Sequence, residues 1–257
     1  MVGRKNFVMK IAFAGSRDLA VKIINWISKN KNKYNIEIVG GVAPEFKGWW
    51  DDQVKKEYKK LNIPIYSNIG EMIADGKPDI IFSLNYWKII PAEQIEKVRY
   101  GIINIHHSYR LRFRGRFSTS WAIIHARNDD NWVHGTTIHY IDKELDNGKI
   151  IASEKCKIEE NDTAESLFVK VEELAINIFK TSFHKIIDGP KSFIEPDPTF
   201  FYYDRNSKKD LEIDSLKSNH QVEDYMRAWT FKDRPLPLIK FDGKKISYEE
   251  YKKMQKK

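Results

Sequence analysis

Residues Lys10 to Ser28 read KIAFAGSRDLAVKIINWIS and join a strand to a helix through a tight turn. Lys10 to Ala14 is an apolar run of strand length, whereas Val21, Ile24 and Ile27 recur at helical spacing. Further apolar runs of strand length are Ile36 to Val42, Ile63 to Tyr66, Asp79 to Leu84 and Gly101 to His106. Because helical spacers separate several of these runs, the pattern predicts an α/β fold with a doubly wound, mostly parallel, Rossmann-like sheet.

The pattern changes after Asn104. A basic loop leads to a predicted helix near Thr119 to Arg127 and then to strands near Gly135 to Ile141 and Lys149 to Ile158. A long helix follows, with Asp162 expected as its N-cap and Gly189-Pro190 as its stop. From Pro196 the chain becomes aromatic and is interrupted by prolines. We therefore expect a catalytic domain over residues 1–195 and a small C-terminal α+β or β subdomain over residues 196–257.

The composition bounds the class of protein. The chain has 257 residues, of which 41% are hydrophobic and 31% charged, as in an ordinary globular protein. Its apolar stretches are shorter than the ~20 residues that cross a bilayer, and its start resembles no cleaved signal, so a cytoplasmic protein without a membrane partner is expected. The single cysteine, Cys156, supports neither a disulfide nor a cysteine-based metal site. A net charge of +8 favours an acidic partner, which leaves nucleic acid, an anionic membrane and a phosphorylated small substrate open.

Polar side chains end the predicted strand Gly101 to His106, at the sheet edge where open α/β folds bind ligands. Asn104 and His106 share one face of this strand because side chains alternate along a strand. An amide can donate to a developing oxyanion and an imidazole can transfer protons, which are the two needs of acyl transfer to an amine. These two residues are therefore candidate catalytic groups.

Three neighbouring features could assist such a site. Arginines are dense after the strand, at Arg110, Arg112, Arg114 and Arg116, and they indicate either anion binding or a solvated basic loop. Asp146 could lie against His106 and favour its imidazolium form, or it could merely cap a turn. The turn Gly15-Ser16-Arg17 could present a helix N-terminus to a phosphate or be a structural tight turn. It lacks the G-x-G-x-x-G fingerprint, which disfavours a dinucleotide oxidoreductase.

Several motifs together resemble one enzyme family. They are Asn104-Ile105-His106-x-Ser108, Phe113-Arg114-Gly115, His134-Gly-Thr-Thr-Ile-His139 and Leu145-Asp146-x-Gly148. Their order and spacing are similar to those of the formyltransferases that use 10-formyltetrahydrofolate, over about residues 9 to 190. One departure is Tyr109-Arg110-Leu111, where the family usually has Leu-Leu-Pro.

The resemblance implies roles for individual residues. Asn104 corresponds to the oxyanion stabiliser, His106 to the proton-transferring group and Asp146 to the carboxylate that holds and tunes the histidine. The implied cofactor-binding residues are Lys88, Ile89, Ile90, Arg116, Asp142, Lys143, Glu144 and Leu145. The implied substrate-binding residues are Gly15, Ser16, Arg17, Tyr109, Arg112, Arg205, Arg227 and Trp229. No metal is required.

The tail distinguishes the acceptors that the family uses. Its aromatic segment Thr199 to Arg205 and the stretch Arg227 to Phe231 resemble the sugar-nucleotide N-formyltransferases. This resemblance implies formyl transfer to the 4-amino group of a dTDP-linked amino-deoxy sugar, dTDP-4-amino-4,6-dideoxyglucose, for O-antigen and lipopolysaccharide synthesis. It also implies a homodimer and no nucleic-acid partner. The alternative is a methionyl-tRNA formyltransferase or another amine formyltransferase.

Overall fold

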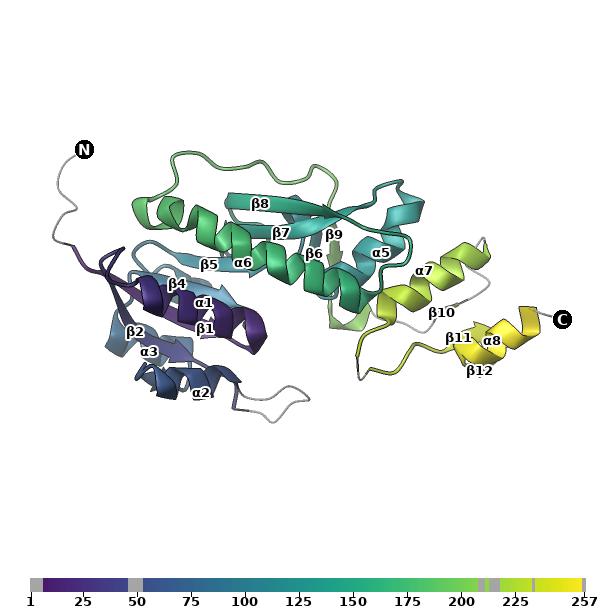
Figure 1. Cartoon of the computed structure of the whole chain (residues 1–257), viewed down its shortest axis with the longest axis horizontal. Helices are drawn as coiled ribbons and strands as arrows, with labels where there is room; N and C mark the ends of the chain where they lie inside the picture. The colour runs from purple at the N-terminus through teal and green to yellow at the C-terminus, as the bar shows by residue number, and fades with distance from the viewer. Residues whose placement is uncertain (1–6, 46–52, 208–210, 213–217, 233, 256–257) are drawn as a thin grey trace. The chain divides into compact units, whose positions relative to one another are not determined.

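The computed structural model describes residues 7–45, 53–207, 211–212, 218–232 and 234–255. The chain divides into two units, and Figure 1 labels the helices and strands that belong to them. Unit 1 comprises Met1–His106, Thr137–Ser153 and Ala175–Glu195, and unit 2 comprises His107–Thr136, Glu154–Leu174 and Pro196–Lys257. The predicted boundary at residue 195 coincides with one limit of these units, but the predicted catalytic domain contributes to both of them.

A mostly parallel sheet confirms the predicted α/β class. Within the described residues it has the strand order β3-β2-β1-β4-β5-β7-β8. Strands β1 to β5 are parallel to one another, and β7 pairs antiparallel with β5. The strands are β1 (Met9–Gly15), β2 (Ile36–Val42), β3 (Ile65–Tyr66), β4 (Ile80–Leu84), β5 (Ile102–His106), β7 (Val133–Tyr140) and β8 (Ile150–Lys157).

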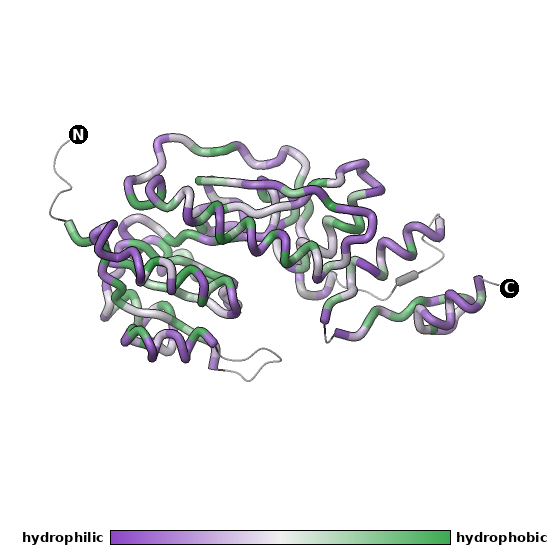
Figure 2. Tube along the Cα trace, in the orientation of Figure 1, coloured by the Kyte–Doolittle hydropathy of each residue, from purple (hydrophilic) through white to green (hydrophobic). Residues whose placement is uncertain are grey.

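Helices cover both faces of the unit 1 sheet because its strands are apolar on both sides. Ile11 and Phe13 of β1 belong to one buried cluster, with α1 (Arg17–Asn30) and α2 (Gln53–Lys60). The second half of α6 (Ala164–Asp188) adds Phe179 and Phe183 to this cluster. Ala12 and Ala14 of β1 belong to a second cluster with α3 (Ile69–Gly76). Along α1 and α6, hydrophobic stretches recur between hydrophilic ones, which is consistent with helices that carry one apolar face (Figure 2).

Most predicted boundaries differ from the structure by one or two residues, and two of the differences have a local physical reason. Strand β3 begins at Ile65 and not at Ile63, because Asn62 is left-handed and Pro64 has no N–H to donate to a ladder. Helix α6 is capped by Thr163 and not by Asp162: the Ser166 N–H donates to Thr163 Oγ1 at 3.2 Å, and the Thr163 N–H donates to Ser166 Oγ at 3.0 Å.

Unit 2 contains short elements that the sequence pattern does not predict. Strand β6 (Phe113–Gly115) pairs in parallel with β9 (Phe201–Tyr203), across the basic loop and the aromatic tail. Tyr203 stacks on Trp121 of α5 (Ser118–Asn128) with ring centroids 3.9 Å apart. The other elements are η1 (Tyr109–Leu111), α4 (Ala92–Ile95, in unit 1), η2 (Arg205–Ser207), β10 (Leu211–Glu212), α7 (Asn219–Trp229), β11 (Ile239–Phe241), β12 (Lys244–Ile246) and α8 (Tyr248–Gln255). Within the described parts, no helix has both the length and the apolar composition of a membrane span.

A buried carboxylate connects α7 to α5 in unit 2. Asp224 is 5% exposed and accepts hydrogen bonds from Arg127 Nε at 2.6 Å and from Arg227 Nε at 3.0 Å. Arg227 Nη1 also donates to the backbone oxygen of Asp162 at 2.8 Å. Two guanidinium groups therefore depend on one carboxylate that has little access to water.

Removing this carboxylate tests its contribution to stability. Asp224→Ala should lower the free energy of unfolding by about 2–4 kcal/mol, because Arg227 loses its carboxylate partner and Arg127 keeps, among the described residues, only an ion pair with the exposed Glu160 at 3.9 Å. Glu223→Ala is the matched control, since its contact with His220 lies between side chains that are 63% and 72% exposed. This control should change stability by no more than about 0.5 kcal/mol. Urea unfolding measures both, and equal effects of the two variants would contradict this account of the pair.

Candidate active site

Strand β5 presents Asn104 and His106 on one face of the sheet, as predicted. Both are partly exposed, whereas Ile105 between them is 3% exposed and packs into the core. In the pairing of β5 with β7, Asn104 lies opposite His139 and His106 lies opposite Thr137. The strand alternation therefore places two polar side chains on the same side as a histidine of the neighbouring strand.

Asp146 joins these side chains from the loop after β7. Its Oδ2 lies 3.7 Å from His106 Nδ1, and its Oδ1 lies 3.8 Å from His139 Nε2. Both distances exceed ordinary hydrogen bonds, so the recorded contacts are electrostatic. The side chains of His106 and Asp146 are 11% and 10% exposed, which leaves the charges poorly screened. The structure thus brings the three predicted catalytic residues together.

His139 is a fourth member, to which sequence reasoning gave no role. Its Nδ1 lies 2.8 Å from the backbone oxygen of Tyr140, and its Nε2 lies 3.2 Å from Asn104 Nδ2. Burial lowers the pKa of His139 to about 4, against the opposing effect of Asp146. The ring is therefore neutral at pH 7. The available signal was the alternation in Thr137-Ile138-His139, which puts His139 on the same strand face as Thr137.

Gly148 explains the last position of the motif Leu145-Asp146-x-Gly148. A Cβ at Gly148 would overlap the carbonyl oxygen of Tyr140, so only glycine allows the loop to return this close to β7. Asp146 adopts a left-handed conformation, with φ of 49°. The turn before it is held by Asp142, whose Oδ1 accepts from the Glu144 N–H at 2.9 Å. Backbone geometry therefore fixes where the Asp146 carboxylate points.

The predicted cofactor residues of unit 1 lie in two loops. Ile89 and Leu145 are 83% and 47% exposed, which is unusual for large apolar side chains and leaves them available to a flat apolar ligand. Lys88 is exposed, but Ile90 is 8% exposed and packs into the core. Asp142, Lys143 and Glu144 form the turn before Leu145. In unit 2, the exposed Arg116 follows β6.

The turn Gly15-Ser16-Arg17 has a clear structural role. A Cβ at Gly15 would come within 2.5 Å of the Leu84 carbonyl oxygen, so glycine permits the close approach of β1 to β4. Ser16 is 4% exposed, and its hydroxyl donates to the Asn85 carbonyl at 2.8 Å and does not cap α1.

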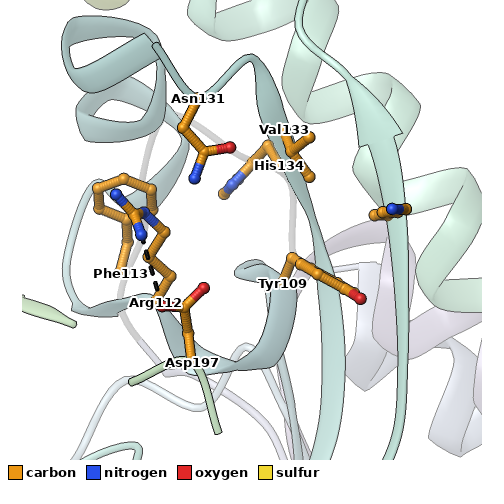
Figure 3. A pocket seen from close by; sticks show the side chains of 8 residues that line it. Tyr109, Arg112, Phe113, Asn131, Val133, His134 and Asp197 are labelled. Atoms are coloured by element: carbon orange, nitrogen blue, oxygen red, sulfur yellow. Dashed lines mark hydrogen bonds and ion pairs between the residues drawn. The ribbon is translucent and has the colours of Figure 1, made fainter. Parts of the chain in front are cut away.

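Tyr109 and Arg112 of unit 2 line a small pocket of about 130 Å³ (Figure 3). The Arg112 guanidinium lies between two carboxylates, with Asp129 at 3.0 Å and Asp197 at 3.4 Å. It is therefore partly neutralised by the protein. The whole lining consists of Tyr109, Arg112, Phe113, Asn131, Val133, His134, Lys155 and Asp197.

The remaining predicted substrate residues lie in the tail. Arg227 donates to Asp224 and Asp162 as described, and its side chain is 11% exposed. Trp229 is 5% exposed and packs edge-on against Phe117 and Trp121. Both placements favour a structural role over the predicted substrate contact. The side chain of Arg205 lies outside the described residues.

The described part of the chain contains no candidate metal-binding site. None of its groups of three or more His, Cys, Asp or Glu side chains could hold a metal ion. The arrangement of Asn104, His106, His139 and Asp146 offers a hydrogen-bond donor and a proton-transfer group beside a fixed charge. This combination suits acyl transfer.

Comparison with known proteins supports the same class. The family model described as formyl transferase matches residues 9–182, more than half of the chain, so the chain belongs to the formyl transferase family. The predicted family is thereby confirmed. The chain is 31% identical to the bifunctional polymyxin resistance protein ArnA of Wigglesworthia glossinidia brevipalpis, over 77% of this chain and 32% of ArnA.

Two further relatives differ in the acceptor that their names state. The GDP-perosamine N-formyltransferase of Brucella melitensis biotype 1 is 30% identical, over 68% of this chain and 65% of that protein. The methionyl-tRNA formyltransferase of Bacillus mycoides is 28% identical, over 86% of this chain and 72% of that protein. The chain thus spans about a third of ArnA and just under two thirds of the GDP-perosamine enzyme.

A solved structure shares the fold. The N-formyltransferase from Helicobacter canadensis, in complex with folinic acid and dTDP-3-aminofucose, superposes with a TM-score of 0.72 and 22% identity. The match covers 93% of this chain and 86% of that one. At this level of identity the likeness shows the fold, and it confirms the predicted α/β formyltransferase architecture.

The low pKa of His139 predicts a particular pH dependence of stability. Because its pKa falls from 6.5 to about 4 on folding, the stabilisation is complete above pH 6.5 and is lost as the pH falls toward 4. At pH 5 this histidine should therefore reduce stability by about 2 kcal/mol relative to pH 7.5. Urea midpoints at both pH values, for the wild type and for His139→Gln, measure this. An identical loss of stability in the two proteins would show that His139 does not contribute.

Proposed function

We propose that this protein transfers a formyl group from 10-formyltetrahydrofolate to the amino group of a nucleotide-linked amino sugar. The observation that carries the proposal is the cluster of Asn104, His106 and Asp146 at the β5–β7 pair of a formyl transferase chain. The specific acceptor proposed is the 4-amino group of dTDP-4-amino-4,6-dideoxyglucose, with a role in O-antigen and lipopolysaccharide synthesis.

The chain's own residues supply the steps of the transfer. The folate cofactor, when bound, supplies the formyl group. Negative charge develops on the formyl oxygen as the amine attacks, and the Asn104 amide donates a hydrogen bond to it. The attacking amine must lose a proton, which His106 accepts, and the leaving nitrogen must gain one. Asp146, 3.7 Å from His106 Nδ1, favours the positive charge that the imidazole carries between these events.

The exposed loop residues fit the folate cofactor. A pterin ring is flat, partly apolar and rich in hydrogen-bonding edges, so it needs both apolar contacts and backbone or carboxylate partners. Ile89 and Leu145 provide exposed apolar surface, and the turn Asp142 to Leu145 provides carboxylate and backbone groups. Within unit 1, Lys88 is an exposed cation available to the glutamate part of the cofactor.

The acceptor is chosen from the relatives and from the tail. A GDP-perosamine N-formyltransferase is 30% identical to this chain, and the structurally similar Helicobacter canadensis enzyme was solved with a dTDP-linked amino sugar. The tail segments Thr199 to Arg205 and Arg227 to Phe231 resemble those of the sugar-nucleotide N-formyltransferases, which favours a nucleotide-linked sugar over a tRNA. The candidate contact described within unit 2 is the pocket lined by Tyr109 and Arg112, where Lys155 offers a cation to a phosphate. A cytoplasmic location and a homodimer through the tail complete the proposal.

A panel of acceptors tests this function. The protein, 10-formyltetrahydrofolate and one acceptor at a time are incubated, and the formylated product is measured by mass spectrometry. We expect turnover with dTDP-4-amino-4,6-dideoxyglucose to exceed that with UDP- or GDP-linked amino sugars and with methionyl-tRNA by at least about 10-fold, since buried polar contacts reject mismatched ligands strongly. Efficient formylation of methionyl-tRNA alone would overturn the sugar assignment and keep the formyltransferase. Formylation of none of the acceptors would overturn the proposed function.

A further inference from the structure

Asn104 must have a defined amide orientation if it is to act as a donor. The oxygen and nitrogen of an amide side chain have nearly the same shape, so a 180° rotation exchanges a donor for an acceptor. The rotated form would aim an oxygen lone pair at the negative charge that develops during transfer. A neighbouring group that accepts and cannot donate would select the productive orientation.

His139 meets this condition through its tautomer. A backbone carbonyl only accepts, so the 2.8 Å contact of Nδ1 with Tyr140 O places the ring proton on Nδ1. In a neutral imidazole the other nitrogen, Nε2, is then an acceptor. This nitrogen lies 3.2 Å from Asn104 Nδ2, so the amide donates one N–H to it and keeps its second N–H for another partner.

The surroundings keep the ring neutral and fixed. His139 is 1% exposed, and the titratable groups facing it are Asp146 at 3.8 Å, His106 with ring centroids 6.5 Å apart, and the more distant Asp142. Burial outweighs the attraction of the carboxylates for a proton and lowers the pKa of His139 to about 4. The ring therefore stays an acceptor throughout the neutral pH range.

The anchor of His139 is itself constrained. The Tyr140 N–H donates to Lys149 O at 3.0 Å, and Gly148 packs so closely on the Tyr140 carbonyl that no Cβ fits there. The carbonyl therefore has little room to turn away from His139 Nδ1. The motif glycine, the backbone carbonyl, the imidazole and the amide form one continuous chain of contacts.

We propose that His139 is a positioning residue that locks the Asn104 amide in the orientation that donates to the formyl oxygen. This inference rests on the proposed function of Asn104. In this proposal, His139 of β7 contributes to the reaction through its contact with Asn104 and not through a contact with the substrate.

A double-mutant cycle tests the proposal. His139→Leu removes the acceptor, and His139→Gln restores an amide oxygen near the position of Nε2. We expect His139→Leu to lower kcat roughly 10- to 100-fold with KM changed less than about threefold, below the 10²–10³ cost of losing an oxyanion donor outright. His139→Gln should recover most of the loss. In an Asn104→Ala background, His139→Leu should cost less than about twofold, because residues that act as a unit are not additive.

The controls distinguish a failure of the positioning role of His139 from a failure of the proposed role of Asn104. The assay uses 10-formyltetrahydrofolate with dTDP-4-amino-4,6-dideoxyglucose, and His184→Leu, on an exposed part of α6, should leave kcat unchanged. Full activity of Asn104→Ala would overturn the role of Asn104 in the proposed function. If Asn104→Ala is impaired, additive losses in the cycle, or a His139→Gln no better than His139→Leu, would overturn the positioning role alone.

A measurement on the wild-type protein needs neither turnover nor a folded variant. Nitrogen-15 NMR of the histidine rings distinguishes the two neutral tautomers and the imidazolium. We expect His139 to carry its proton on Nδ1, with Nε2 unprotonated, from pH 6 to 8. A proton on Nε2 in this range would overturn the proposal, since that nitrogen could then no longer accept from Asn104.

Discussion

The antiparallel pairing of β5 with β7 is the constraint on which the site depends. It places Asn104 opposite His139, 35 residues later in the chain, and it sets His106 opposite Thr137. A slip of one residue in this register would turn the two polar side chains of β5 into the core and Ile105 out of it. Burial of Ile105 and the neighbouring apolar side chains therefore stabilises the strand register of the candidate site as well as the sheet.

The titratable side chains of the candidate site lie close together and have little contact with solvent. The Asp146 carboxylate lies between two imidazoles, at 3.7 Å and 3.8 Å, yet the two rings behave differently. His139 is enclosed and anchored to a carbonyl, so burial lowers its pKa and it remains a neutral acceptor. His106 ends the strand and is partly exposed, which suits a group that must meet an incoming amine. The two histidines that face one carboxylate can therefore have different roles: His139 as a fixed hydrogen-bond acceptor and His106 as the group that transfers protons.

The sequence predicts those parts that follow from local periodicity. Apolar runs of strand length predicted β1, β2, β4 and β5. The alternation of side chains along a strand predicted that Asn104 and His106 share one face. Asp146 could not have been placed by pattern alone, because its position depends on a left-handed residue and on the fit of Gly148 against Tyr140. The role of Asp146 was predicted from the resemblance of the motifs to a known family, and not from the periodicity of the sequence.

Non-local contacts account for what was missed. The pairing of β6 with β9 joins segments far apart in the chain, and three-residue strands carry too little pattern to be seen. The resemblance implied a substrate contact for Arg227, whose partner Asp224 could only be recognised as a buried carboxylate once α7 was placed. The role of His139 likewise needed the register of two strands, since the histidine itself could equally have been a core residue.

The adjacent histidines at the end of β5 allow the most direct test of the central claim, that strand register creates the site. His106 faces Asp146, whereas His107 is 8% exposed and packs edge-on against Phe168, with ring centroids 5.0 Å apart. Single-turnover formyl transfer should be compared for His106→Asn and His107→Asn, with thermal unfolding recorded for both. The account predicts that His106→Asn lowers the rate at least about 10²-fold, the scale of a lost general acid–base group, while the folded His107→Asn stays within about fivefold of wild type. A larger loss for His107→Asn than for His106→Asn, with both proteins folded, would contradict the register and the site built on it.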